Sequence, residues 1–201
     1  LNRKYHKAYN RTREFNFSLM GLTGFDMHGK TVGVIGTGKI GVCAIKILRG
    51  FGCHVIAYDI YPDPEVAKME GVKYVTLDEV LAQSDIITLH APLNKGTYHM
   101  INAESIGKMK DGVMLINTSR GALVDTPALL DALVSGKLGS AALDVYEQEK
   151  HFFFTDKSDD NIQDMILARL TSCHNVLITG HQAFLTDEAL SAIAESTLDS
   201  C

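Results

Sequence analysis

The segment 31–41 constrains the fold of this chain most, because an apolar strand pattern in it runs directly into a glycine-rich turn. Its sequence is Thr-Val-Gly-Val-Ile-Gly-Thr-Gly-Lys-Ile-Gly. Gly36 allows the tight turn, Gly38 lets the backbone approach a diphosphate, and Gly41 lets the following helix pack closely on the strand. The pattern predicts a dinucleotide site. The alternative is a plain strand-to-helix connection, since glycine-rich turns are common.

The residues around this turn favour the dinucleotide interpretation. A helix whose first residues are Lys39 and Ile40 would direct its free N–H groups and its positive dipole end at the phosphates. A second apolar run, 54–58, is followed by Asp59. This aspartate lies about 20 residues after the turn, where such a unit places the carboxylate that accepts from the adenosine ribose hydroxyls. Because a carboxylate would repel the 2′-phosphate of NADP, Asp59 indicates NAD.

Continuous, β-branched apolar runs recur along the 201 residues and are typical of strands that are covered on both faces. The expected strands are 31–36, 54–59, 86–91, 113–118, 140–146 and 175–179, and the expected helices are 39–51, 64–70, 78–83, 102–109, 126–135, 161–172 and 187–199. Asp78 and Thr126 are the expected N-caps of two helices. The alternation predicts an α/β fold, a Rossmann-type doubly wound parallel sheet. An amphipathic helix is expected in residues 1–20.

Composition argues against several classes of protein. The net charge of −5 and the scattered basic residues argue against a nucleic-acid partner. No apolar segment approaches the ~20 residues that a membrane-spanning helix needs. Cys43, Cys53, Cys173 and Cys201 are dispersed without a C-x-x-C pair, which indicates a reducing, cytoplasmic environment.

Chemically active side chains follow three of the expected strands. In a parallel sheet such residues share the carboxyl edge, where ligands bind. Arg120 offers a planar fork of donors for a carboxylate, with a surface arginine as the alternative. Glu147 and Glu149 lie in a polar loop, where acids are usually only solvated. His181 is either a catalyst or a hydrogen-bonded structural residue. These side chains form a site only if they lie close together.

Four blocks occur in order and carry a resemblance to a known family. They are Val-Ile-Gly-Thr-Gly-Lys-Ile-Gly (34–41), Asn-Thr-Ser-Arg-Gly-Ala-Leu-Val-Asp (117–125), Leu-Asp-Val-Tyr-Glu-Gln-Glu (143–149) and Gly-His-Gln-Ala-Phe (180–184). On these motifs the chain resembles the D-2-hydroxyacid dehydrogenases, and within them the bacterial fermentative D-lactate branch. Lys150 and Gly180 stand where other branches usually carry proline, which favours the lactate branch.

The resemblance implies a role for each matched residue. Arg120 resembles the family's substrate-anchoring arginine, Glu149 its catalytic glutamate and His181 its proton donor. Glu149 is chosen over Glu147 because the family's glutamate is the later acid of this loop. The other implied contacts are Asp144 with the nicotinamide carboxamide, Ala91 and Pro92 with the adenine and ribose, Thr97 with the cofactor, Thr118 and Ser119 with the nicotinamide side, and Phe184 as an aromatic wall beside a small substrate.

The same resemblance implies reversible hydride transfer between NADH and a small 2-oxoacid, with pyruvate to D-lactate as the expected reaction and no metal. We expect a poorly active fragment of a two-domain enzyme: an interdomain helix in 1–20, an NAD-binding domain in 21–185, and in 186–201 the start of a helix returning to the catalytic domain. A homodimer is expected, helped by residues 10–28. The alternatives are a non-catalytic NADH-sensing module, as in corepressors of the superfamily, and more distantly a metal-dependent hydrolase.

Overall fold

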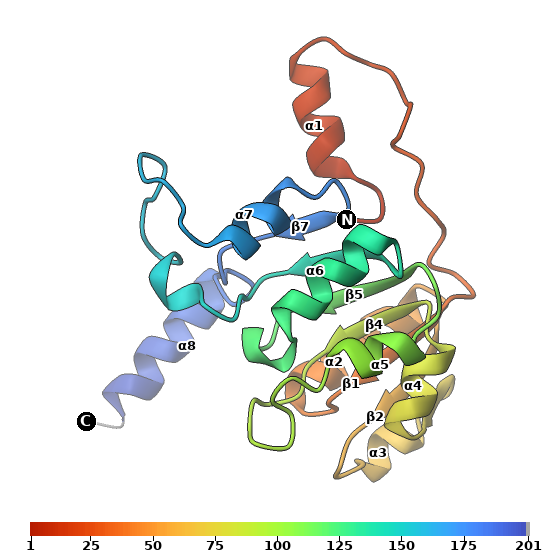
Figure 1. Ribbon diagram of the computed structural model, residues 1–201. Helices are drawn as coiled ribbons and strands as arrows, with labels where there is room; N and C mark the ends of the chain where they lie inside the picture. Colours follow the sequence, from red (N-terminus) through yellow and green to blue (C-terminus); the bar gives the residue numbers. More distant parts are fainter. Residues whose placement is uncertain (200–201) are drawn as a thin grey trace.

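Seven parallel strands form one sheet in the computed structural model, which describes residues 1–199 (Figure 1). Across the sheet the strands are β3 (Val72–Tyr74), β2 (His54–Tyr58), β1 (Thr31–Ile35), β4 (Ile86–Leu89), β5 (Val113–Asn117), β6 (Leu138–Leu143) and β7 (Val176–Ile178). The strand order reverses beside β1, which pairs with β2 on one side and β4 on the other. This is the doubly wound Rossmann-type arrangement, and the predicted fold class is confirmed. Ligands of such sheets bind at the reversal point, outside the carboxyl ends of the strands.

Helices cover the sheet on both faces, which explains why its central strands are apolar without interruption. One face carries α4 (Leu77–Gln83), α5 (Ala103–Lys108), α6 (Thr126–Ser135) and α7 (Met165–Ser172); the other carries α2 (Lys39–Gly50) and α3 (Pro64–Ala67). Leu89 and Leu115 are fully buried in the larger core. Burial of one such side chain contributes about 1.5–3 kcal/mol. Packing therefore fixes the strand ends that carry the polar residues.

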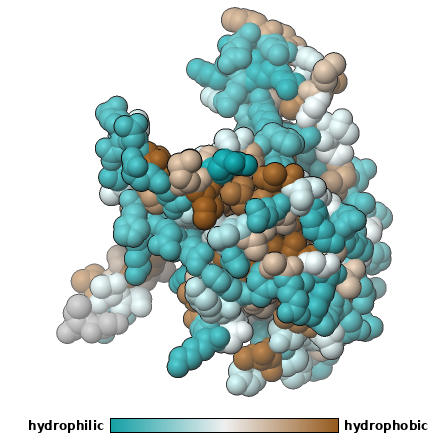
Figure 2. Space-filling model, in the orientation of Figure 1, coloured by the Kyte–Doolittle hydropathy of each residue, from teal (hydrophilic) through white to brown (hydrophobic). Residues whose placement is uncertain are grey.

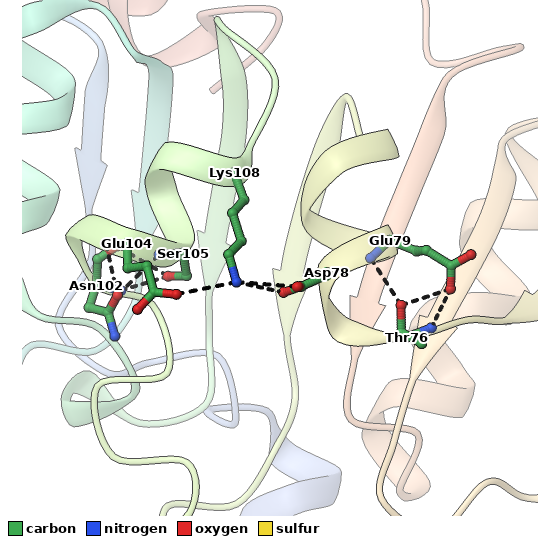
Figure 3. A network of polar contacts seen from close by, with 7 residues as sticks. All are labelled: Thr76, Asp78, Glu79, Asn102, Glu104, Ser105 and Lys108. Atoms are coloured by element: carbon green, nitrogen blue, oxygen red, sulfur yellow. Dashed lines mark hydrogen bonds and ion pairs between the residues drawn. The ribbon is translucent and has the colours of Figure 1, made fainter.

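Two predicted helix caps are wrong, because in each helix the capping residue lies one or two positions before the predicted one. Thr76, not Asp78, caps α4: its Oγ1 accepts from the backbone N–H of Glu79, whose carboxylate accepts from the backbone N–H of Thr76 in return (Figure 3). Asp125, not Thr126, caps α6 by accepting from the N–H of Ala128. Figure 3 also shows Asp78 in its actual role, as an ion-pair partner of Lys108 from α5.

One strand was not predicted, and some element bounds differ from the expected ones. β3 is three residues long and only half-buried at the sheet edge, so its sequence lacks the apolar run that marked the other strands. β6 begins at Leu138 and α7 at Met165. The last helix, α8 (Asp187–Leu198), leaves the sheet at its carboxyl edge (Figure 1). The predicted C-terminal segment ends at residues 200–201, which lie outside the described residues.

The N-terminal segment contains a shorter helix than predicted. Only α1 (Tyr5–Arg13) is helical, and Figure 1 shows it standing away from the sheet before the chain turns back. Beyond it, Phe15, Phe17, Leu19 and Met20 are at least 71% exposed. In Figure 2 apolar residues, shown in brown, lie at the outer end of this projection. The segment therefore presents an apolar surface that the other described residues do not cover.

Candidate active site

The glycine-rich turn between β1 and α2 has room for glycine alone at two positions. Gly36 has a positive φ of 95°, and a Cβ there would overlap the backbone of Ala91. A Cβ at Gly41 would overlap the carbonyl oxygen of Gly36. In contrast, a Cβ at Gly38 would meet nothing within 4 Å. The turn is thus closely packed at Gly36 and Gly41 and open at Gly38. Directly after Gly38, α2 begins with the exposed residues Lys39 and Ile40.

Asp59 lies at this turn, as the sequence predicted, and its carboxylate is held there. Oδ2 accepts from the backbone N–H of Thr37 at 2.7 Å and from its hydroxyl at 3.1 Å. Oδ1 accepts from the backbone N–H of Tyr61 at 2.9 Å. A carboxylate has about four acceptor positions, so Asp59 can still accept from a ligand.

Hydroxyl groups tie together the loops that follow β4 and β5. Ser119, after β5, donates from Oγ to the carbonyl oxygen of Ala91 at 2.8 Å. Thr97 donates from Oγ1 to the carbonyl oxygen of Pro92 at 2.6 Å. Because Ala91 also lies against Gly36, residues from three loops line one continuous edge. Thr118 is exposed on this edge.

His181 and Glu149 form a hydrogen-bonded pair at the carboxyl end of β7, which is an ion pair when the imidazole is protonated, although they are 32 positions apart in the sequence. Nδ1 of His181 lies 3.0 Å from Oε1 of Glu149, and the side chains are 23% and 21% exposed. A carboxylate only accepts hydrogen bonds, so Nδ1 carries the hydrogen of this contact. Nε2 is therefore the ring nitrogen left for a substrate.

Asp144 holds the backbone that presents His181. Its carboxylate accepts from the backbone N–H groups of Gln182 and Ala183 at 3.0 and 2.8 Å and from the hydroxyl of Thr179, while its carbonyl oxygen accepts from the N–H of His181. His181 has a positive φ of 56°, a conformation that persists only when its surroundings hold it. Asp144, which is 5% exposed, supplies that support.

Arg120 lies in the loop that follows β5, the strand that pairs with β6, and its side chain is exposed to solvent. Within residues 1–199 its side chain makes one hydrogen bond, from Nη1 to the carbonyl oxygen of Ser119 at 2.7 Å, so its other donors are free for a ligand. Gly121 packs on the backbone of Tyr146, whose N–H donates to Glu149 at 3.1 Å. The Arg120 loop is thus joined to the ion pair through backbone packing, and within the described residues no direct bond links Arg120 to His181.

Sequence reasoning missed several residues around the ion pair. The ring centroid of Phe154 lies 5.8 Å from that of His181, and the centroid of the predicted Phe184 lies 6.2 Å from it. Glu147 is paired with His99, at 2.7 Å between Oε1 and Nε2. Phe154 ends a run of three phenylalanines at 152–154, which was its only sequence signal, and no local signal joins His99 to Glu147. Within the described part of the chain no cluster of three His, Cys, Asp or Glu side chains could hold a metal.

Comparison with known protein families shows to which family this chain belongs. A family model described as "D-isomer specific 2-hydroxyacid dehydrogenase, NAD binding domain" matches residues 1–183. The chain belongs to this family. It is an NAD-binding domain, and the prediction of NAD is confirmed. No helix among residues 1–199 is long and apolar enough to span a bilayer.

Individual members of the family match almost the whole chain. A 2-hydroxyacid dehydrogenase homolog of Haemophilus influenzae is 59% identical over 98% of this chain and 60% of its own length. The D-lactate dehydrogenase of Escherichia coli is 56% identical with the same coverage. The structure of the Aquifex aeolicus D-lactate dehydrogenase, complexed with NAD and lactic acid, has a TM-score of 0.90 at 38% identity and covers 100% of this chain and 61% of its own. The chain therefore spans about 60% of the length of the relatives it matches.

The geometry of the turn fits NAD. The space in front of Gly38 admits a ligand against the start of α2, and twelve residues of helix stand behind it to supply a dipole. The carboxylate of Asp59 is fixed beside the turn, and its negative charge would oppose a phosphate group placed there. These features agree with the unphosphorylated form of the cofactor.

Proposed function

We propose that the chain is the NAD-binding part of a dehydrogenase that interconverts a small 2-oxoacid, pyruvate foremost, and the corresponding D-2-hydroxyacid. The observation that carries this proposal is the ion pair of His181 and Glu149, which stands at the same sheet edge as the glycine-rich turn. A proton donor and a cofactor turn on one edge are what carbonyl reduction needs. Relatives that are named D-lactate dehydrogenases support the choice of substrate.

In this proposal the residues of the edge divide between the two halves of the cofactor. Asp59 takes the adenosine ribose, and Asp144, which keeps one free acceptor position, takes the nicotinamide carboxamide. The diphosphate lies on Gly36, Gly38, Lys39, Ile40 and Gly41, and the walls are Ala91, Pro92, Thr97, Thr118 and Ser119.

The side chains of this chain would then carry out the proton transfer. NADH, when bound, supplies the hydride for the carbonyl carbon of the 2-oxoacid. His181 donates a proton from Nε2 to the carbonyl oxygen and takes one back in the reverse direction. Glu149 keeps the ring oriented through Nδ1. Arg120 grips the substrate carboxylate with its free donors, and Phe184 limits the space beside a small substrate.

A hybrid enzyme tests this function. The hybrid is the Escherichia coli D-lactate dehydrogenase in which this chain replaces the matching residues, a substitution that its 56% identity favours. We expect the hybrid to oxidise NADH only when pyruvate is present. A folded hybrid that binds NADH, does not reduce any small 2-oxoacid, and changes its association with another protein would contradict the proposal and favour an NADH sensor.

We also propose that two copies of the chain associate through the projecting N-terminal segment. On this segment Phe17 and Leu19 are 71% and 81% exposed. Surfaces of this kind usually mark an interface. We expect the chain to sediment as a dimer and a Phe17→Ser, Leu19→Ser variant to sediment as a monomer. A monomeric unsubstituted chain at micromolar concentration would overturn the association.

A further inference from the structure

A tyrosine on the edge strand β3 is joined to the glycine-rich turn by a chain of hydrogen bonds. The hydroxyl of Tyr74 donates to Oγ1 of Thr37 at 2.7 Å, and the hydroxyl of Thr37 donates to Oδ2 of Asp59 at 3.1 Å. At the other end, the backbone N–H of Asp63 donates to the Tyr74 hydroxyl at 3.1 Å. Residues from three separate segments, the turn, β3 and the loop between β2 and α3, thus form one network that ends at the carboxylate of Asp59.

The direction of every bond in this chain is fixed by its two ends. An N–H group can only donate and an ionised carboxylate can only accept. Tyr74 must therefore use its one hydrogen on Thr37, and Thr37 must use its one hydrogen on Asp59. Thr37 is 5% exposed, so its hydroxyl is shielded from water. The Thr37 hydroxyl therefore cannot rotate without losing its bond to Asp59.

Tyr74 itself is held by packing. Its ring lies against the core beneath α2 and α3, a cluster formed by Val34, Ile45, Val55, Ala57 and Val66. Its strand pairs with β2, the strand that Asp59 follows. The Tyr74 hydroxyl is therefore held in a fixed position beside the turn. Because the ring is held by packing, its hydrogen bond can restrain Thr37.

We propose that Tyr74 is a positioning residue for the cofactor: through Thr37 it fixes the carboxylate of Asp59 for the diol of the adenosine ribose and so sets the preference for a dinucleotide without a 2′-phosphate. The inference rests on the proposed role of Asp59. It assigns no contact between Tyr74 and the cofactor. A carboxylate that is already oriented loses no rotational freedom when the ribose binds, which raises affinity without a new contact.

Binding to the unsubstituted and substituted chains tests this assignment. We expect Tyr74→Phe to raise the Kd for NADH about 5-fold, the size of effect that one hydrogen bond supports. The Kd for NADH that lacks the 2′-hydroxyl of its adenosine ribose should change less than about 2-fold, because that ligand makes less use of Asp59. The ratio of the Kd values for NADPH and NADH should fall. Tyr58→Phe is the matched control, since within residues 1–199 the Tyr58 hydroxyl makes no hydrogen bond.

A double-mutant cycle separates the relay from a structural role. Thr37→Val removes the middle of the relay, so adding Tyr74→Phe to it should weaken NADH binding no further. If Tyr74→Phe weakens both ligands equally, or weakens NADH equally in the Thr37→Val background, Tyr74 acts through Asp63 or the fold and the assignment is overturned. An unaltered Kd in Tyr74→Phe overturns it as well. A chain that folds and does not bind NADH at all would instead overturn the proposed function.

Discussion

Replacement of His181 by glutamine is expected to lower pyruvate-dependent NADH oxidation by the hybrid enzyme about 10³-fold, within the range that general acid catalysis provides. Glutamine can still donate a hydrogen bond but cannot deliver a proton. The Kd for NADH should stay within about 2-fold of the unsubstituted value, because no contact with the cofactor is assigned to the ring. Steady-state kinetics and fluorescence titration measure the two quantities separately.

The backbone at this position requires a second variant. His181 has a φ of 56°, and asparagine tolerates that conformation better than most residues. His181→Asn should therefore show the same loss of turnover with the turn intact. His54→Gln, on an exposed histidine at the start of β2, is the matched control and should keep full turnover. Turnover within about 10-fold of normal in both His181 variants would remove this residue from proton transfer.

Replacement of Gly41 by alanine should have the largest effect on cofactor binding. The added Cβ would overlap the carbonyl oxygen of Gly36, so α2 must move away from the turn. Backbone contacts do not relax as flexible side chains do, and we expect a loss of about 3 kcal/mol in the free energy of unfolding. NADH binding should weaken more than about 100-fold, since the N–H groups of the turn and helix would no longer share one geometry. Urea denaturation and NADH titration measure these effects.

Two other glycines provide controls with opposite expectations. Gly38→Ala places its Cβ in open space, so stability should hardly change while NADH binding falls, because the methyl group occupies the space of the diphosphate. Gly50→Ala also meets nothing within 4 Å and stands at the end of α2, far along the helix from the turn. It should affect neither quantity by much. NADH binding to Gly38→Ala with the normal Kd would contradict the assignment of the turn.

Local sequence patterns sufficed for six of the seven strands and for the turn. The strands β1, β4 and β5 are buried on both faces, so each had a continuous apolar run. Gly36 and Gly41 are dictated by overlaps that any other residue would create. The caps of α4 and α6 were misplaced because Thr76 and Asp125 precede the apolar pattern that marks each helix. Helix starts depend on one hydrogen bond, which periodicity does not reveal.

The side-chain contacts within the site could not be predicted from the sequence, because folding brings their residues together. Sequence alone left Glu147 and Glu149 as rivals until motif matching chose Glu149. In the structure Glu149 faces His181, while Glu147 bonds to His99 and Thr126. These pairs join loops that are distant in the chain, and no local signal encodes them. β3 was missed for a related reason: it is short and half-exposed, and its importance lies in Tyr74, whose partner is 37 positions away.

The central claim is that hydride passes from the cofactor on the glycine-rich turn to a 2-oxoacid held beside His181. Isotope transfer tests it most directly. The hybrid enzyme is given pyruvate and NADH deuterated at C4 of the nicotinamide, on each face in turn, and the lactate is analysed by mass spectrometry and chiral chromatography. The account predicts D-lactate with one deuterium at C2 from one of the two labelled cofactors. Lactate that carries no deuterium from either cofactor, or no lactate from a folded hybrid that binds NADH, would contradict it.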